Sequence, residues 1–179
     1  MIEDRIDLMC YPKWNMKIYP VCLLKGDYMD RIKLYCDGAA SNNGKEDAIG
    51  GWAFAIIKYD EVVCFSSGKV IGATNQMMEL QAMVTGCAYI EAYHLQDCLV
   101  DIYSDSAYII NCFNQNWWCN WEKNDWLNSK KEPVANKTLW ELLIPSFKKV
   151  NYTFNKVKGH NGDKWNEYVD KLAVQARLS

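Results

Sequence analysis

Hydrophobic and polar positions follow a regular pattern only beyond residue 30 of the chain. Three strands are expected first, over 32–37, 51–59 and 61–71, and the junction Tyr59-Asp60-Glu61 between the last two is very short. A junction of this length favours an antiparallel hairpin. The sheet is therefore expected to begin as a meander.

Helical spacing appears next. Thr74 is a suitable N-cap for a helix over 75–93, and apolar residues recur along it at the spacing of one helix face. The residues of this face are Met77, Leu80, Val84, Cys87 and Ala88. The remaining elements are expected as a strand over 98–103, a helix over 106–113, a short helix with an exposed loop over 115–134, a helix over 137–149, a strand over 151–157 and a helix over 163–177.

This order of elements predicts one mixed domain of the α/β (α+β) class, with a five-stranded mixed sheet and helices on both of its faces. The domain is expected to occupy residues 31–179. Residues 1–30 show no clear period and contain Pro12 and Pro20, so they are expected to form an N-terminal extension of uncertain structure.

Composition narrows the class of protein. Half of the 179 residues are hydrophobic and the formal net charge is −2, so overall charge would not draw the chain to a polyanion. No apolar run approaches the length of a membrane span, and the first residues are acidic, unlike a signal peptide. We expect a soluble monomer in the cytoplasm, or in the nucleus or an organelle if the source is eukaryotic, with no membrane partner.

The cysteines also indicate an intracellular protein. Eight of them are scattered without a Cys-x-x-Cys pair, a pattern typical of buried thiols in a reducing compartment. Zinc binding is the alternative. It is disfavoured because the two histidines, His94 and His160, do not stand near a cysteine at ligand spacing.

Two acids follow separate strands. Asp37 and Asp105 each stand where a predicted strand ends, at the sheet edge where open α/β sheets place ligands. Hard divalent cations prefer clusters of such oxygen ligands. A single aspartate at a strand end is more often a turn former or a helix cap, so the inference depends on the combination of acids.

Several segments together resemble type 1 ribonuclease H, in the order that this family has, over residues 31–177. The segments are Tyr35-Cys36-Asp37-Gly38-Ala39-Ala40-Ser41, Thr74-Asn75-Gln76-Met77-Met78-Glu79-Leu80, Tyr103-Ser104-Asp105-Ser106 and Lys158-Gly159-His160, with Asp170 after them. The resemblance implies a ribonuclease H-like fold. It also implies that Asp37, Glu79, Asp105 and Asp170 are the metal-binding carboxylates and that His160 is the mobile histidine beside them.

The activity implied by the resemblance is endonucleolytic hydrolysis of the RNA strand of RNA/DNA hybrids, leaving 5′-phosphate and 3′-hydroxyl ends. Four carboxylates suit two Mg²⁺ ions about 3.5 to 4 Å apart, with Mn²⁺ as a possible substitute. One ion would activate the attacking water, the other would stabilise the leaving 3′ oxygen, and Asp37 would be shared between them. His160 would carry a proton or assist product release, the alternative being an exposed loop histidine.

Helical spacing agrees with the assigned acids. Glu79 lies one residue away from the expected apolar face of its helix, and Asn166 and Asp170 share a flank of the last helix. The expected core face of that last helix consists of Trp165, Val169, Leu172, Ala173 and Ala176. The simpler alternative is that Glu79 and Asp170 are ordinary surface acids.

Substrate contacts are also implied by the resemblance. The loop from Gly38 to Asn43, together with Asn75 and Gln76, would contact the ribose and the minor groove, where a 2′-hydroxyl marks the RNA strand. A phosphate of the DNA strand would be held by Thr74 and Asn136, and aromatic rings would pack on deoxyriboses. The aromatic residues are Tyr108, Trp117 and Trp121. The alternative roles are turn formation and capping for the polar residues and core packing for Tyr108.

The chain departs from the family pattern at two places. Met77 stands where the family often has an arginine, which removes a bidentate phosphate contact. The Trp-rich loop is electrically balanced, with Lys123, Lys130 and Lys131 against Glu122, Asp125 and Glu132. Hybrid affinity is therefore expected to be modest.

Two other functions remain open at this point. A DNA-directed integrase or resolvase would share the fold, but the segments around Thr74 and His160 argue against it. A non-catalytic module that binds hybrids is the second alternative, and the complete set of four acids argues against that.

Overall fold

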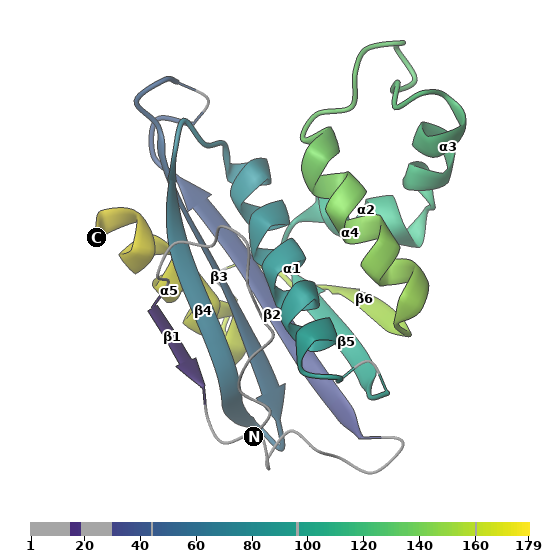
Figure 1. The fold of residues 1–179 in the computed structure, drawn as a ribbon. Coiled ribbons are helices and arrows are strands. Elements are labelled where there is room, and N and C mark those ends of the chain that lie inside the picture. Colours follow the sequence, from purple (N-terminus) through teal and green to yellow (C-terminus); the bar gives the residue numbers. More distant parts are fainter. Residues whose placement is uncertain (1–14, 19–29, 44, 96, 160) are drawn as a thin grey trace, which may run out of the picture.

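The structure is a computed structural model, which describes residues 15–18, 30–43, 45–95, 97–159 and 161–179. A mixed sheet of six strands forms its centre, in the order β1-β4-β3-β2-β5-β6 (Figure 1). The strands are β1 (Asn15–Ile18), β2 (Arg31–Ala40), β3 (Ile49–Lys58), β4 (Glu61–Ile71), β5 (Leu99–Ser104) and β6 (Tyr152–Lys156). The helices are α1 (Asn75–Ala92), α2 (Ala107–Asn114), α3 (Trp117–Lys123), α4 (Lys137–Lys149) and α5 (Lys164–Leu178).

The first part of the sheet is the expected meander. Strands β2, β3 and β4 pair antiparallel, with Lys58 opposite Glu61 at the tight hairpin turn. Strands β5 and β6 then add in parallel to β2. The five predicted strands and the mixed α/β class are confirmed.

Strand β1 was not expected. It pairs antiparallel with β4 and adds a sixth strand to the outer edge of the sheet. Its residues fall within the extension 1–30, for which no structure was predicted. Of residues 1–30, only 15–18 and Asp30 are among the described residues, so the rest of the predicted extension lies outside the description.

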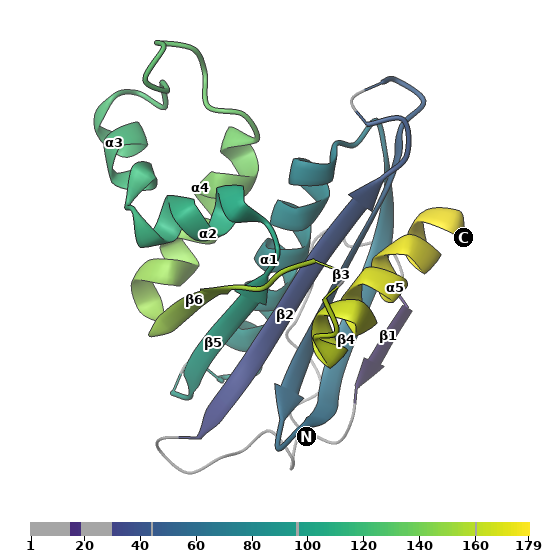
Figure 2. The ribbon, with the colours of Figure 1, turned by 180° about the vertical axis from the view of Figure 1, so that it is seen from behind.

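Helices cover both faces of the sheet, as predicted. Helix α1 packs on β2 and β3 and also contacts α4, whereas α5 packs on the opposite face against β2, β3 and β4 (Figures 1 and 2). Helices α2, α3 and α4 gather beside β5 and β6, on the same side as α1. The larger core cluster therefore lies between the sheet and α1, and a smaller one lies under α5.

The apolar face predicted for α1 is partly wrong. Leu80, Val84 and Cys87 are buried, but Ala88 is exposed and Met77 is only half-buried. Other residues of the helix are fully buried instead, among them Met78, Met83 and Ile90. The cause is that α1 lies between the sheet and α4. Its side chains are therefore buried on two sides of the helix and not along one face.

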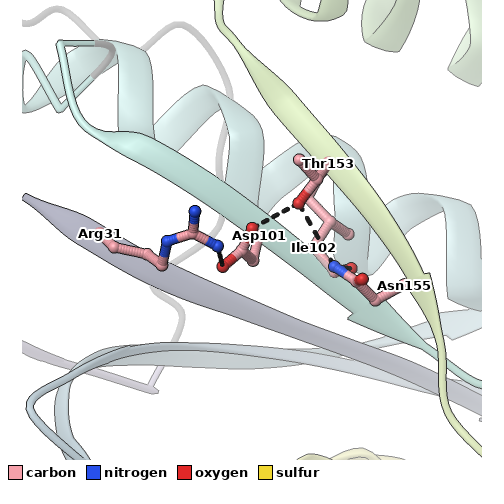
Figure 3. Close-up of polar contacts among 5 residues, drawn as sticks. All are labelled: Arg31, Asp101, Ile102, Thr153 and Asn155. Atoms are coloured by element: carbon pink, nitrogen blue, oxygen red, sulfur yellow. Dashed lines mark hydrogen bonds and ion pairs between the residues drawn. The ribbon is translucent and has the colours of Figure 1, made fainter. Parts of the chain in front are cut away.

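A polar network ties the three parallel strands together (Figure 3). Arg31 on β2 donates to Oδ2 of Asp101 on β5 over 2.7 Å, and the Thr153 hydroxyl on β6 donates to the other oxygen of Asp101. Asn155 on β6 also donates to the backbone oxygen of Ile102 over 3.3 Å. Since Asp101 is buried, these partners offset the cost of its desolvation, and they support the register of the strands that lead to Asp37 and Asp105.

Candidate active site

Adjacent parallel strands bring Asp37 and Asp105 to the same level of the sheet. Tyr35 on β2 pairs with Tyr103 on β5, and each aspartate lies two residues further along its own chain segment. Asp37 is still within β2 and is only 7% exposed, whereas Asp105 follows the end of β5 and is half-buried. This register brings the two strand-end acids to one edge of the sheet, as expected.

Helix α1 brings Glu79 to the same place because its first turn packs directly on the backbone of β2. A Cβ added to Gly38 would stand 2.3 Å from the backbone nitrogen of Glu79, a distance that no side chain could tolerate. Glycine beside Asp37 therefore permits the contact. Thr74 begins the helix as predicted, since its hydroxyl accepts a hydrogen bond from the backbone N–H of Met77.

Helix α5 approaches from the other face. A Cβ on Gly51 of β3 would stand 2.0 Å from the backbone oxygen of Ala173, so this helix also lies against the strand without an intervening side chain. Ala53 of β3 pairs with Asp37, and Asp170 is half-buried one turn before Ala173. The fourth acid is thus placed near the first.

The charges of neighbouring acids act on two of the four carboxylates, Asp37 and Glu79, and add to the effect of burial. Burial raises the pKa of Asp37 to about 8, and the charge of Asp105 raises it next, with smaller effects from Asp170 and Glu79. The amide of Gly38, which donates to Oδ1 of Asp37 over 2.7 Å, acts in the opposite direction. Burial likewise raises the pKa of Glu79 to about 7, opposed by Ser106 and assisted by Asp105.

The chemistry of this donor set fits a divalent cation. Carboxylate oxygens are the preferred ligands of hard cations, and a bound cation would offset the burial and the repulsion that together raise these pKa values. Within the described ranges, no group of three or more acidic, histidine or cysteine side chains has an arrangement that could hold a metal ion as it stands. The fit rests on the donor chemistry and on the effects of the neighbouring acids on Asp37 and Glu79.

The predicted histidine cannot be placed, because His160 lies outside the described residues. Its neighbour Gly159 is described, and a Cβ there would stand 2.6 Å from Oδ2 of Asp105. The backbone N–H of Val157 donates to the oxygen of Ser104 over 3.1 Å, which ties this segment to the end of β5. The chain that leads to His160 therefore passes directly beside Asp105.

The polar residues expected at the ribose have local structural roles. Asn75 accepts a hydrogen bond from the backbone N–H of Ala40 over 2.6 Å through Oδ1, and the N–H of Asn75 donates to Oδ1 of Asn43 over 2.9 Å. These bonds join the loop after β2 to the start of α1, while Gln76 is exposed. Asn43 and Asn75 thus have the local structural roles that were the alternative interpretation. A contact with substrate remains a prediction for Asn43, Asn75 and Gln76.

The aromatic residues differ in burial. Trp121 is only 8% exposed and packs on Trp140, with ring centroids 5.3 Å apart, so it belongs to the core and not to an open contact surface. Trp117 and Tyr108 are half-buried neighbours whose ring centroids lie 6.2 Å apart. Asn136 precedes α4 in the left-handed conformation, with φ 57°, and makes no side-chain cap.

Sequence reasoning missed Ser106. This residue is buried and its side chain acts to lower the pKa of Glu79, but in the sequence it was interpreted only as the start of a helix and as part of the segment around Asp105. The one available signal was its position directly after Asp105.

Comparison with known proteins agrees with the fold. The RNase H family matches residues 29–177. Ribonuclease H of Syntrophomonas wolfei is 43% identical over 148 residues, which are 83% of this chain and 97% of that protein. Among solved structures, LC9-RNase H1, described as a type 1 RNase H with the type 2 active-site motif, superimposes with a TM-score of 0.73 at 21% identity, over 86% of this chain and 75% of that one.

A further solved structure is LC11-RNase H1 in complex with an RNA/DNA hybrid, with a TM-score of 0.63 and 20% identity, over 83% of this chain and 99% of that one. The fold is that of an RNase H domain. The chain belongs to the RNase H family of enzymes, and the resemblance to type 1 ribonuclease H is confirmed. In the described part of the chain, no helix is both long and apolar enough to cross a membrane.

Proposed function

We propose that this protein hydrolyses the RNA strand of RNA/DNA hybrids, using divalent metal ions held by Asp37, Glu79, Asp105 and Asp170. The observation that carries the proposal is the convergence of these four acids from β2, α1, the end of β5 and α5, where the charges of the other three add to burial in raising the pKa of Asp37. A stable fold has no need to bring four carboxylates together. Family membership and the hybrid-bound LC11-RNase H1 support the choice of substrate.

Two Mg²⁺ ions, or Mn²⁺ in their place, would supply an activated water and stabilisation of the leaving 3′ oxygen, giving 5′-phosphate and 3′-hydroxyl products. The residues of the chain prepare the site. Asp37 is the most deeply buried of the four acids, which suits a carboxylate shared between two ions. Gly38 and Gly51 keep α1 and α5 close enough for Glu79 and Asp170 to reach it.

His160 is proposed as a proton carrier for this group of acids. It follows Gly159, which lies against the Asp105 carboxylate, and precedes Asn161-Gly162, where Gly162 has a φ of 81°. Such a setting suits a residue that moves during turnover better than a fixed ligand. Its role would be to accept and release a proton near the leaving group.

The surface beside the acids is proposed to hold the hybrid. The N-termini of α1 and α4 lie at the same end of the molecule (Figure 1), and their positive ends favour a phosphate between Thr74 and Asn136. Asn43, Asn75 and Gln76 would contact the RNA strand, and Trp117 with Tyr108 would pack on deoxyriboses. For Trp121 we propose no direct contact with the hybrid. Its packing on Trp140 in the core would instead hold the surface residues in place.

The proposal is tested by incubating the protein with a labelled RNA/DNA hybrid, a DNA duplex and an RNA duplex of the same sequence, with Mg²⁺, with Mn²⁺ and with EDTA. We expect cleavage of the hybrid alone, in its RNA strand, and only with a metal. The Asp105→Asn variant serves as the control for a contaminating nuclease. End-labelling identifies the product ends, and cleavage of the DNA duplex would favour an integrase-like or resolvase-like enzyme instead.

A further inference from the structure

Strand β1 lies outside the part of the chain that the family shares. The match to the RNase H family begins at residue 29, whereas β1 comprises Asn15–Ile18. In the sheet order β1-β4-β3-β2-β5-β6, β4 would be the edge strand if β1 were absent. Both views show β1 beside β4, at the edge of the sheet opposite to β6 (Figures 1 and 2). The added strand therefore changes which backbone groups this edge presents.

The strand that β1 covers has few of the features that keep edge strands from pairing. β4 is 11 residues long, and its residues 62–68, Val-Val-Cys-Phe-Ser-Ser-Gly, contain no charge and no proline. Charged side chains stand only nearer its ends, at Glu61 and Lys69. A long uncharged edge readily pairs with another strand, because its backbone N–H and C=O groups are available for hydrogen bonds. Without β1, this stretch would be a site of association.

Strand β1 pairs with the centre of this uncharged stretch. The register is antiparallel and places Asn15 opposite Ser67 and Ile18 opposite Cys64. Each backbone group of β1 that bonds to β4 satisfies a group that would otherwise bond to water or to another chain. The positions that β1 occupies on β4, 64–67, are thus positions that a strand from another molecule would need.

We propose that the β4 edge is a self-association surface, that its partner is β4 of a second copy of this chain, and that residues 15–18 block it by occupying it in the same chain. A second copy fits because two identical antiparallel strands are related by a two-fold axis, so one edge supplies both halves of the contact. Apolar side chains would add to the backbone bonds, since Val62 and Phe65 are half-buried and Ile71 is 75% exposed.

The sheet order limits the size of the assembly. β3 occupies the other edge of β4, so pairing of two β4 edges would stop at a dimer. β3 also separates β4 from β2, the strand that carries Asp37. The proposal therefore goes beyond the proposed catalytic function and does not depend on it.

Two proline variants of the full-length protein, Met16→Pro and Lys17→Pro, test the block. Along an antiparallel strand, successive N–H groups point to opposite sides, so only one of these two residues directs its N–H toward β4. Proline should break the pairing at that position and be tolerated at the other, which makes the tolerated variant a matched control. Hydrogen exchange at low protein concentration identifies them, because amides of 64–67 that bond to β1 should exchange about tenfold faster or more in the broken variant.

Sedimentation across a wide concentration range then measures association. We expect the wild type and the tolerated variant to be monomers, and the mass of the broken variant to rise with concentration up to about twofold, with protection of the β4 amides returning as the dimer forms. Ser67→Lys in the broken variant adds a charge to the uncharged stretch and should restore the monomer. Circular dichroism checks that each variant keeps its fold.

Three results would overturn the proposal. One is a broken variant that stays monomeric although its β4 amides exchange freely, because the exposed edge would then not associate. Another is that neither proline changes exchange at 64–67, because β1 would then not occupy the edge. The third is a dimer that persists with Ser67→Lys, because the contact would then lie elsewhere on the molecule. Cleavage of hybrids is measured separately, and its absence would bear on the proposed function alone.

Discussion

The backbone of Gly159 lies directly against the carboxylate of Asp105, since a Cβ on the glycine would stand 2.6 Å from Oδ2 of that aspartate. Real Cβ atoms do not approach an oxygen so closely, so any side chain at this position would displace either the carboxylate or the segment that leads to His160. The absence of a side chain at residue 159 is therefore part of the geometry of the site.

Gly159→Ala should reduce kcat by about 10- to 100-fold, because a misplacement of about 1 Å in a catalytic group can cost that much. Gly72→Ala is the matched control. Gly72 has open space around its Cβ position but a φ of 72°, so alanine there should cost stability and leave kcat unchanged. Rates at saturating Mg²⁺ and hybrid, with melting temperatures, check both expectations, and a fully active Gly159→Ala protein would contradict the first.

A second prediction concerns pH and stability in the metal-free protein. The pKa of Asp37 is about 8 in the folded state against an ordinary value of 3.8, so between these pH values the folded protein binds a proton that the unfolded chain releases. Stability should therefore fall as pH rises from about 4 to about 8, and Glu79, with its pKa raised to about 7, acts in the same direction.

Thermal unfolding in EDTA across this pH range measures the effect. Asp37→Asn should flatten the dependence and raise the melting temperature at pH 8, although cleavage is abolished because a neutral amide is a poor metal ligand. Mg²⁺ should raise the melting temperature of the wild type at pH 8 and do so much less in the variant. A melting temperature that increases steadily with pH in EDTA would show that the pKa of Asp37 is not raised in the folded protein.

Local signals explain how much of this structure could be predicted. The Thr74 cap and the short junction 59–61 marked α1 and the hairpin, and both were confirmed. Strand β1 gave no signal, because its four residues acquire a strand conformation only by pairing with β4, about 50 positions further along the chain. The burial of Trp121 could not be predicted from the sequence either, because tertiary packing decides which of several neighbouring indole side chains is buried in the core.

The acids show a similar division. Strand ends alone indicated that Asp37 and Asp105 could meet, whereas Glu79 and Asp170 were added only through the family resemblance, because no spacing rule brings two helices to one edge. The close contacts at Gly38 and Gly51 that make this possible are visible only in the folded chain.

The third prediction concerns His160. His160→Ala should lower kcat but leave measurable cleavage, because water can partly replace a proton carrier whereas it cannot replace a carboxylate ligand. Single-turnover and steady-state rates should be compared with those of Asp105→Asn. Loss of activity as complete as in that variant would exclude the role of a proton carrier.

Burial separates the expected effects of two tryptophans. Trp121→Ala should destabilise the fold by about 3 to 5 kcal/mol, the cost of removing a large buried aromatic side chain. Trp117→Ala, at a half-buried position, should instead weaken hybrid binding by about 1 to 3 kcal/mol with a smaller effect on stability. Denaturant unfolding and hybrid binding in an Asp105→Asn background measure both, and the reverse order of effects would show that Trp117 is the structural residue.

The last prediction concerns the salt dependence of hybrid binding. Met77 provides no cation, and the three lysines of the Trp-rich segment, Lys123, Lys130 and Lys131, are matched by the three acids Glu122, Asp125 and Glu132. Few cations then remain to neutralise phosphates. Since log affinity falls with log salt in proportion to the phosphates neutralised, the slope should correspond to about two to four contacts.

Two substitutions should move that slope in opposite directions. Met77→Arg should steepen it and raise affinity at low salt, because an arginine near the start of α1 adds a bidentate phosphate ligand. Lys123→Ala should make it shallower, whereas Lys164→Ala should not change it, since Lys164 pairs with Asp60 at the start of α5, on the opposite face of the sheet from α1. Binding to a hybrid across a salt series in the Asp105→Asn background measures all three. A steep slope in the parent protein would mean that cations outside the Trp-rich loop hold the hybrid and that aromatic packing contributes less than we propose.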